Sequence, residues 1–162
     1  MKKDTHCSYC GTVFEAENYP KNCSHCGQIT YINPLPVAVT LLTVGKGLLV
    51  LKRNIEPQKG HWALPGGFME IGETWQQAVV RELQEETNIE ISAEKVQFFD
   101  LLSNPQGTVM LVFGLIQTPE HFALPDFKGN EEVSELAVIT EFQELAFPLH
   151  TEAVRNFFKI SS

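Results

Sequence analysis

The 162-residue sequence contains no run of about eighteen apolar residues, so it has no candidate transmembrane helix. Its first ten residues, MKKDTHCSYC, include two lysines but no apolar stretch after them, and a secretory signal peptide needs such a stretch. We therefore expect a cytoplasmic protein without a membrane partner. In that compartment cysteines remain thiols unless they bind a metal.

Basic residues are also too few to dominate the charge. Twelve lysines and arginines stand against twenty aspartates and glutamates, which gives a net charge of −8. The charges are balanced within residues 1–32, so residues 33–162 carry the whole acidic excess. An acidic surface does not attract polyanions, so the sequence predicts no nucleic-acid partner. It favours a protein that meets a small anionic substrate through bound divalent cations.

Cysteine is absent beyond residue 26, and the four cysteines form two near-identical motifs. Each motif has the pattern C-x-x-C-G, in residues 7–11 and 23–27. Each places two thiolates on one tight turn, and two such turns complete a tetrahedral zinc site of four sulfurs. The predicted zinc ligands are Cys7, Cys10, Cys23 and Cys26. A disulfide pair or free thiols are the alternatives. His6 and His25 are expected at the surface, because four sulfurs already complete the coordination.

The cysteine motifs predict a zinc ribbon over residues 1–32, followed by a second domain over residues 33–162. Between them, Pro34 and Pro36 predict an extended linker over residues 31–36, because proline is poorly tolerated in helices and central strands. Apolar periodicity and turn residues predict the elements of the second domain. The expected strands are 37–44, 48–51, 96–102, 108–117 and 133–139, and the expected helices are 74–87 and 151–160. This order predicts an α+β fold with a mixed β-sheet packed between helices.

The helix expected at 74–87 has an unusual acidic face. Thr74 and Gln77 have the spacing of a capping box, so the helix should begin there. On a helical wheel, three carboxylates share the core-facing side with apolar residues, and Gln84 lies opposite. These carboxylates belong to Glu82, Glu85 and Glu86. A bound divalent cation would offset their mutual repulsion, whereas the alternative is a solvated acidic turn.

These residues resemble the Nudix box. The segment 67–89 has the pattern G-x5-E-x7-REL-x-EE-x-x-I, with Gly67, Glu73 and Arg81 at its fixed positions. One position departs, because Asn88 stands where the family has a glycine near the helix end. Asparagine is the next best residue to glycine in the left-handed conformation of a C-terminal cap, so we expect a positive φ at this residue. The resemblance implies a Nudix-like α/β/α sandwich.

Three segments outside the box are similar to a Nudix subgroup that carries a zinc ribbon. After the paired cysteine turns, they are Tyr31-x-Asn33-Pro34, Arg53 to Pro57 and Trp62 to Phe68. This subgroup is associated with hydrolysis of ADP-ribose, FAD or NADH-type dinucleotides. The resemblance therefore implies a hydrolase that cleaves a diphosphate with water, giving a nucleoside monophosphate and a phosphorylated fragment.

The resemblance also implies roles for individual residues. Four groups would bind Mg²⁺ or Mn²⁺, whose preferred ligands are oxygen atoms. They are the carboxylates of Glu82, Glu85 and Glu86 and the backbone carbonyl of Gly66. Arg81 would hold the carboxylates in place through charge-assisted hydrogen bonds. Glu73 would brace the preceding loop against the helix, and its alternative role is a favourable charge at the helix N-terminus.

Several assignments stay open at this point. The general base is Glu82 or an acidic residue of a later loop. The loop candidates are Glu131, Glu132 and Glu135. Arg53 either contacts a phosphate or lies on the surface. An aromatic ring should stack on the base of the substrate, or else these rings belong to the core. The aromatic candidates are Phe68, Phe99, Phe113 and Phe147.

Two other functions compete with hydrolysis. A non-hydrolytic nucleotide sensor would need fewer carboxylates than the chain has, and a zinc-ribbon adaptor for nucleic acid would need a basic cluster that the neutral ribbon lacks. We expect the ribbon to be structural or to support a homodimer, because four cysteines leave no open position on the zinc.

Overall fold

The computed structural model describes residues 4–15 and 18–160 of the chain. The chain divides into two compact units, Met1–Pro34 and Leu35–Ser162. None of the described helices is long and apolar enough to cross a membrane.

The smaller unit is built around the two cysteine turns and a short hairpin. Strands β1 (Lys21–Asn22) and β2 (Ile29–Thr30) pair antiparallel. In each turn the glycine that follows the second cysteine donates its N–H to the carbonyl of the first, at 3.0 Å in one turn and 2.9 Å in the other. Both glycines have positive φ, 76° at Gly11 and 71° at Gly27, a region that favours glycine over residues with a side chain.

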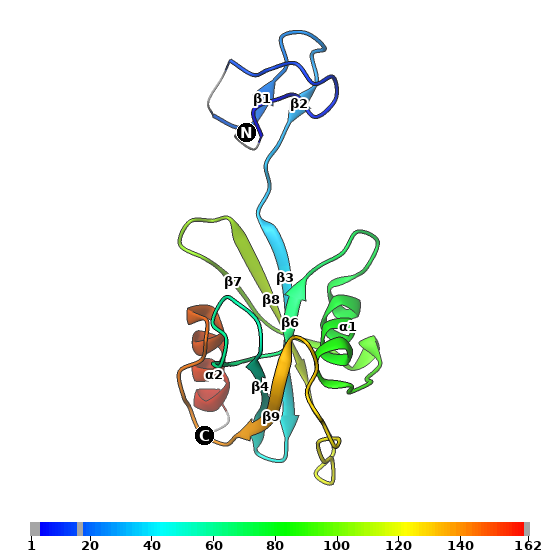
Figure 1. The fold of residues 1–162 in the computed structure, drawn as a ribbon, viewed down its shortest axis with the longest axis vertical. Coiled ribbons are helices and arrows are strands. Elements are labelled where there is room, and N and C mark those ends of the chain that lie inside the picture. The colour runs from blue at the N-terminus through cyan, green and yellow to red at the C-terminus, as the bar shows by residue number, and fades with distance from the viewer. Residues whose placement is uncertain (1–3, 16–17, 161–162) are drawn as a thin grey trace. The chain divides into compact units, whose positions relative to one another are not determined.

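The larger unit contains a seven-stranded mixed sheet (Figure 1). The strand order is β5-β4-β3-β8-β7, with β6 pairing with β3 and β9 pairing with β4. Only β3 and β8 run parallel to each other, and the other pairs are antiparallel. The strands are β3 (Leu35–Val44), β4 (Gly47–Arg53), β5 (Trp62–Ala63), β6 (Gly66–Phe68), β7 (Gln97–Ser103), β8 (Val109–Ile116) and β9 (Val133–Ile139).

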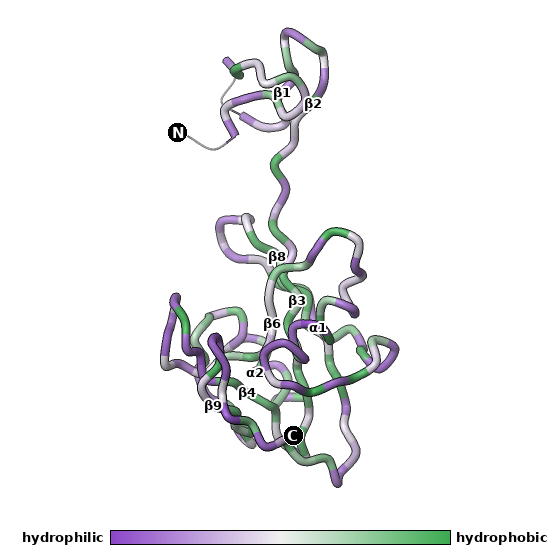
Figure 2. The backbone as a smooth tube through the Cα atoms, turned by 45° about the vertical axis from the view of Figure 1, so that its right-hand side comes forward, coloured by the Kyte–Doolittle hydropathy of each residue, from purple (hydrophilic) through white to green (hydrophobic). Residues whose placement is uncertain are grey.

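Two helices cover opposite faces of this sheet, α1 (Trp75–Thr87) on one and α2 (Pro148–Ile160) on the other (Figure 1). Alternate residues of β3 point to the two faces, as the period of a strand requires. Ala38 and Leu42 pack in the cluster that contains α1, whereas Val39 and Leu41 pack in the cluster that contains α2. Figure 2 shows the apolar residues concentrated along β3, β4 and β8. The predicted mixed sheet between helices is confirmed.

Strands β5 and β6 were not expected, and several element boundaries differ from the expected ones, two of them at prolines. The predicted linker over residues 31–36 is wrong at its end, because Leu35 and Pro36 belong to β3. Pro36 pairs with Met110 of β8, and its carbonyl accepts a hydrogen bond from the Met69 N–H at 3.1 Å, so the proline lacks only the one bond that its own N–H would donate. Helix α2 begins at Pro148, three residues earlier than expected, because proline suits the first turn of a helix.

Candidate active site

A cavity of about 750 Å³ opens where α1, β6 and the loop before β9 meet. It contains most of the residues that the box pattern singled out. Those that line it are Gly66, Gly67, Arg81, Glu82, Glu85 and Glu86, together with Arg53, Phe68, Glu131 and Glu132. Residues separated by up to about eighty positions in sequence therefore converge on one hollow.

Both ends of α1 have the predicted caps. Thr74 accepts a hydrogen bond from the Gln77 N–H at 3.3 Å, and the Gln77 side chain accepts from the Thr74 N–H at 2.7 Å. At the other end, Asn88 has φ 60° and ψ 20°, and its N–H donates to the Gln84 carbonyl. The expected left-handed cap is confirmed, and the helix places its glutamates at one end of the cavity.

Two of the three helix glutamates face inward. Glu86 is only 6% exposed and accepts a hydrogen bond from the Gly66 N–H at 2.8 Å. Burial raises the pKa of Glu86 to about 8, and burial also raises the pKa of Glu82. The expectation that Glu85 shares this inward face is wrong, because its side chain is 60% exposed. Leu83 is fully buried on the core-facing side of α1, whereas Glu85 lies at the margin of this apolar stripe.

Arg81 joins the loop before the helix to the helix carboxylates. Its Nε and Nη2 donate to the two carboxylate oxygens of Glu73 at 3.0 and 2.8 Å. Its Nη1 donates to Glu82 at 2.7 Å and to Glu85 at 3.1 Å. These bonds hold the pKa of Glu73 below its usual range, and Glu73 also accepts from the Glu70 N–H at 2.7 Å. The contacts of Glu73 are therefore those of a brace between loop and helix.

The glycines of β6 permit a close approach between this strand and its neighbours. A Cβ at Gly67 would lie 2.4 Å from a carboxylate oxygen of Glu82. A Cβ at Gly66 would lie 2.4 Å from the carbonyl oxygen of Ala38 in β3. Any side chain at either position would displace the strand or the carboxylate.

The structure separates the acidic loop candidates. Glu131 and Glu132 line the cavity, whereas Glu135 does not line it and forms an ion pair with Lys52 at 3.4 Å. Arg53 also lines the cavity, and its Nε donates to the Pro57 carbonyl at 2.8 Å.

The four aromatic candidates are separated in the same way. Phe68 is 58% exposed and lines the cavity, but Phe113 is fully buried in the core. Phe99 packs against Phe157 at 6.4 Å between ring centroids. Phe147 lies beneath the Arg53 guanidinium at 5.2 Å.

The sequence pattern assigned no role to four residues that line the cavity, Ile55, Met69, Glu70 and Asn130. Asn130 contacts both the end of α1 and the backbone of the acidic loop. The only signal in the sequence is an asparagine after Gly129, which is typical of any turn.

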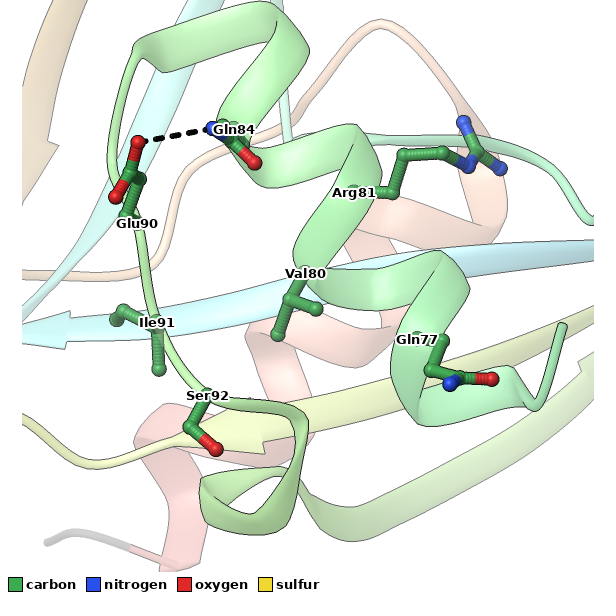
Figure 3. A pocket seen from close by; sticks show the side chains of 7 residues that line it. All are labelled: Gln77, Val80, Arg81, Gln84, Glu90, Ile91 and Ser92. Carbon is green, nitrogen blue, oxygen red and sulfur yellow. Dashed lines mark hydrogen bonds between the residues drawn. The ribbon is translucent and has the colours of Figure 1, made fainter.

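A second hollow of about 570 Å³ lies along the outer side of α1 (Figure 3). Gln77, Val80 and Ile91 are among the residues that line it, and Gln84 donates to Glu90 at 3.0 Å. Figure 3 shows the Arg81 guanidinium directed away from the Gln84–Glu90 pair. Its lining has one carboxylate and no cluster of charged oxygens, so it does not compete as a catalytic site.

The four cysteines form a separate cluster in the smaller unit. Their sulfur atoms all lie within 4.8 Å of one another. The Sγ atoms of Cys7 and Cys26 are 3.7 Å apart, and those of Cys10 and Cys23 are 3.6 Å apart. A disulfide needs about 2.0 Å, so the sulfurs are not paired covalently. His6 and His25 are exposed, as expected.

The NUDIX domain model matches residues 33–159. The chain belongs to the NUDIX family. This region contains the whole cavity, and proteins of the family generally use divalent metal ions.

Two curated relatives match shorter stretches. The ADP-ribose pyrophosphatase of Methanocaldococcus jannaschii is 44% identical over 59 residues, which are 36% of this chain and 35% of the relative. The NAD-capped RNA hydrolase NudC of Haemophilus influenzae is 36% identical over 95 residues, 56% of this chain and 36% of the relative. The chain thus matches only about a third of the length of either relative.

Solved structures are also similar to this chain, and one of them is a NUDIX hydrolase. A NUDIX hydrolase from Nitrosomonas europaea has a TM-score of 0.71 and 26% identity, and the match covers 96% of this chain and 90% of that one. A bifunctional NMN adenylyltransferase/ADP ribose pyrophosphatase from Francisella tularensis has a TM-score of 0.59 and 28% identity, over 68% of this chain and 35% of that one.

Proposed function

We propose that this NUDIX protein hydrolyses the diphosphate of a nucleoside diphosphate linked to a second moiety. The observation that carries the proposal is the pair of carboxylates of Glu82 and Glu86, both directed into the cavity beside the Gly66–Gly67 backbone. A sensor that only binds nucleotide would gain nothing from burying two negative charges beside an anionic ligand.

The residues present fit a hard divalent cation. Among the described residues, the Gly66 N–H is the one group that donates a hydrogen bond to Glu86, and burial of this carboxylate raises its pKa to about 8. A cation would compensate that charge, and carboxylate and carbonyl oxygens are the ligands that Mg²⁺ and Mn²⁺ prefer. The proposed ligands are Glu82, Glu85, Glu86 and the Gly66 carbonyl. When bound, such ions neutralise phosphate oxygens and lower the pKa of a bound water.

The other residues of the cavity orient these groups. Arg81 holds Glu82 and Glu85 by charge-assisted hydrogen bonds, and Glu73 holds Arg81. The general base is proposed to be Glu82, Glu131 or Glu132, since these carboxylates line the cavity. Phe68 offers an exposed ring for stacking on a base, and Arg53 offers a cation for a phosphate.

The substrate class rests on the names of the relatives. One is an ADP-ribose pyrophosphatase and another is a NAD-capped RNA hydrolase, so both names concern a nucleotide that contains a diphosphate. We propose ADP-ribose, FAD or NADH-type compounds as substrates. The RNA relative means that the predicted absence of a nucleic-acid partner needs a direct test, because a capped RNA presents the same linkage.

The cysteine cluster fits a structural Zn²⁺. Four sulfurs bound tetrahedrally at about 2.3 Å would be about 3.8 Å apart, close to the separations of 3.7 and 3.6 Å. We propose a zinc ribbon over residues 1–32 and a hydrolase domain over residues 33–162. Thiolates held by zinc suit the cytoplasm, where free thiols remain reduced.

The test is a product analysis with Mg²⁺ and with Mn²⁺. ADP-ribose, FAD, NADH, a NAD-capped RNA and nucleoside triphosphates are each incubated with the protein. We expect AMP and a phosphorylated fragment from at least one diphosphate-linked compound. Faster conversion of triphosphates to monophosphate and pyrophosphate would contradict the substrate class. Binding without any product under either metal would favour the sensor.

A further inference from the structure

Asn130 connects the catalytic helix to the acidic loop. Its side-chain amide donates to the carbonyls of Glu85 and Glu86, each at 3.3 Å. Carbonyls in the last turn of a helix have no partner within the helix, so they are free to accept these bonds. The Oδ1 of the same side chain accepts from the N–H groups of Glu132 at 3.0 Å and Val133 at 2.7 Å.

Asn54, the residue that follows β4, holds the same loop from the other side. Its side-chain amide donates to the carbonyls of Asn130 at 3.4 Å and Glu131 at 3.2 Å. Its backbone N–H donates to the carbonyl of Glu132 at 2.7 Å. Three consecutive carbonyls of the loop therefore accept hydrogen bonds from one asparagine.

These contacts fix the loop carboxylates relative to the helix carboxylates. Glu131 and Glu132 project from the loop that the two asparagines hold, and they line the same cavity as Glu82 and Glu86. A displacement of about 1 Å can cost two orders of magnitude in rate when reacting groups must be aligned.

We propose that Asn130, supported by Asn54, is a positioning residue that holds the Glu131–Glu132 loop in register with the end of α1. The inference rests on the proposed hydrolase function. Asn130 itself is exposed, and exposed hydrogen bonds contribute little to folding, so its loss should affect turnover far more than stability.

Three variants of Asn130 separate its two contacts. Asn130→Ala removes both. Asn130→Ser and Asn130→Asp keep an acceptor for the loop N–H groups, but neither can donate to the helix carbonyls at that distance. The serine variant loses the contact with the helix without adding a charge. We expect kcat to fall roughly 10–100-fold in all three variants, and in Asn54→Ala to a smaller extent.

Asn104 provides a matched control. Its Oδ1 accepts from the N–H groups of Thr108 at 2.9 Å and Val109 at 3.0 Å, in the turn between β7 and β8. Asn104→Ala removes the same kind of turn contact and does not touch the cavity lining. It should lower the unfolding midpoint as much as Asn130→Ala does, with kcat unchanged.

A double-mutant cycle distinguishes positioning of the loop carboxylates from a merely structural role, because only positioning makes the effect of Asn130 on kcat depend on Glu131 and Glu132. In a Glu131→Gln/Glu132→Gln background, whose residual turnover is measured on the best substrate, adding Asn130→Ala should change kcat less than twofold. An unchanged kcat in Asn130→Ala and Asn130→Ser, or an undiminished effect in the double background, would overturn the positioning role alone. An inactive wild-type protein would overturn the proposed function, and this inference with it.

Discussion

At the scale of single residues, the helix carboxylates should affect turnover and stability in opposite directions. Changing Glu82, Glu85 or Glu86 to Gln should lower kcat by about two orders of magnitude or more, because cation binding and charge compensation are lost. Without metal, Glu86→Gln should raise stability at neutral pH. The pKa of Glu86 is raised to about 8, so its ionised form is disfavoured in the folded state as pH rises above the unfolded value near 4.5. Turnover and chelator-treated melting temperature measure the two effects.

Glu90→Gln is the matched control for these variants. Glu90 is exposed and bonded to Gln84 on the outer side of α1, so the same charge change occurs away from the cavity. It should leave kcat unchanged. Glu85→Gln should differ from Glu86→Gln in stability, because an exposed carboxylate gains little from neutralisation. Loss of activity only in proportion to loss of folding would make the glutamates structural.

His150 should make the larger unit sensitive to acid. Its Nδ1 accepts from the Leu64 N–H at 3.2 Å, and burial together with the nearby Arg53 charge lowers its pKa to about 3. In the unfolded state His150 therefore binds a proton below about pH 6.5, whereas in the folded state it binds one only below about pH 3. The contribution to the free energy of unfolding should fall by about 2 kcal/mol between pH 7 and pH 5.

The comparison variant is His150→Asn, whose Oδ1 can take the place of the acceptor nitrogen without titrating. Denaturant unfolding followed at pH 7 and pH 5 measures both proteins. The variant should be less stable at pH 7 and should lose less stability on acidification than the wild type. Equal pH dependence in the two proteins would show that His150 does not carry the effect.

At the scale of elements, the end of α1 depends on one backbone conformation. Asn88 has φ 60°, a region that glycine adopts freely and β-branched residues avoid. Asn88→Gly should be neutral or mildly stabilising. Asn88→Val should lower the free energy of unfolding by about 1–3 kcal/mol through strain at this position. Urea denaturation measures both. A valine variant as stable as the wild type would contradict the capping argument.

The helices and most strands were predictable because their signals are local. The capping box and apolar periodicity of α1 and the β-branched apolar run of β3 each lie within about a dozen residues. The exposure of Glu85 was not predictable, because a wheel gives an angle but not the width of the buried stripe. Pro36 belongs to a strand because it pairs with Met110 of β8, and that partner lies 74 positions away in the sequence.

The residues of the candidate site also divide into those with a local sequence signal and those without one. The carboxylates of α1 and the glycines of β6 lie within one contiguous motif, so the sequence could place them together. The hydrogen bonds of Asn54 with Asn130 and Glu131 join residues 76 and 77 positions apart, and no local sequence pattern pairs segments at that separation. The choice of Phe68 over Phe113 likewise required the tertiary packing, which exposes the first ring and buries the second.

At the scale of the whole molecule, the two units carry different fluorophores. All three tyrosines, Tyr9, Tyr19 and Tyr31, lie within the first 34 residues, and both tryptophans, Trp62 and Trp75, lie beyond them. The apolar clusters found among the described residues of the larger unit draw only on residues beyond 36. Tyrosine and tryptophan signals therefore report separately on the folding of each unit.

The final prediction uses this separation to test the zinc site. Metal analysis should find one zinc per chain, and the smaller unit should need it to fold, because its buried apolar residues are chiefly the cysteines themselves. Cys10→Ser, or a strong chelator, should abolish the tyrosine-reported transition. The tryptophan-reported melting temperature should stay unchanged. His25→Ala is the matched control within the second cysteine motif, and it should retain the zinc because that side chain is exposed. Purified protein without zinc, with four freely titratable thiols, would refute the ribbon, whereas loss of zinc on His25→Ala would show that the histidine takes part in binding the metal.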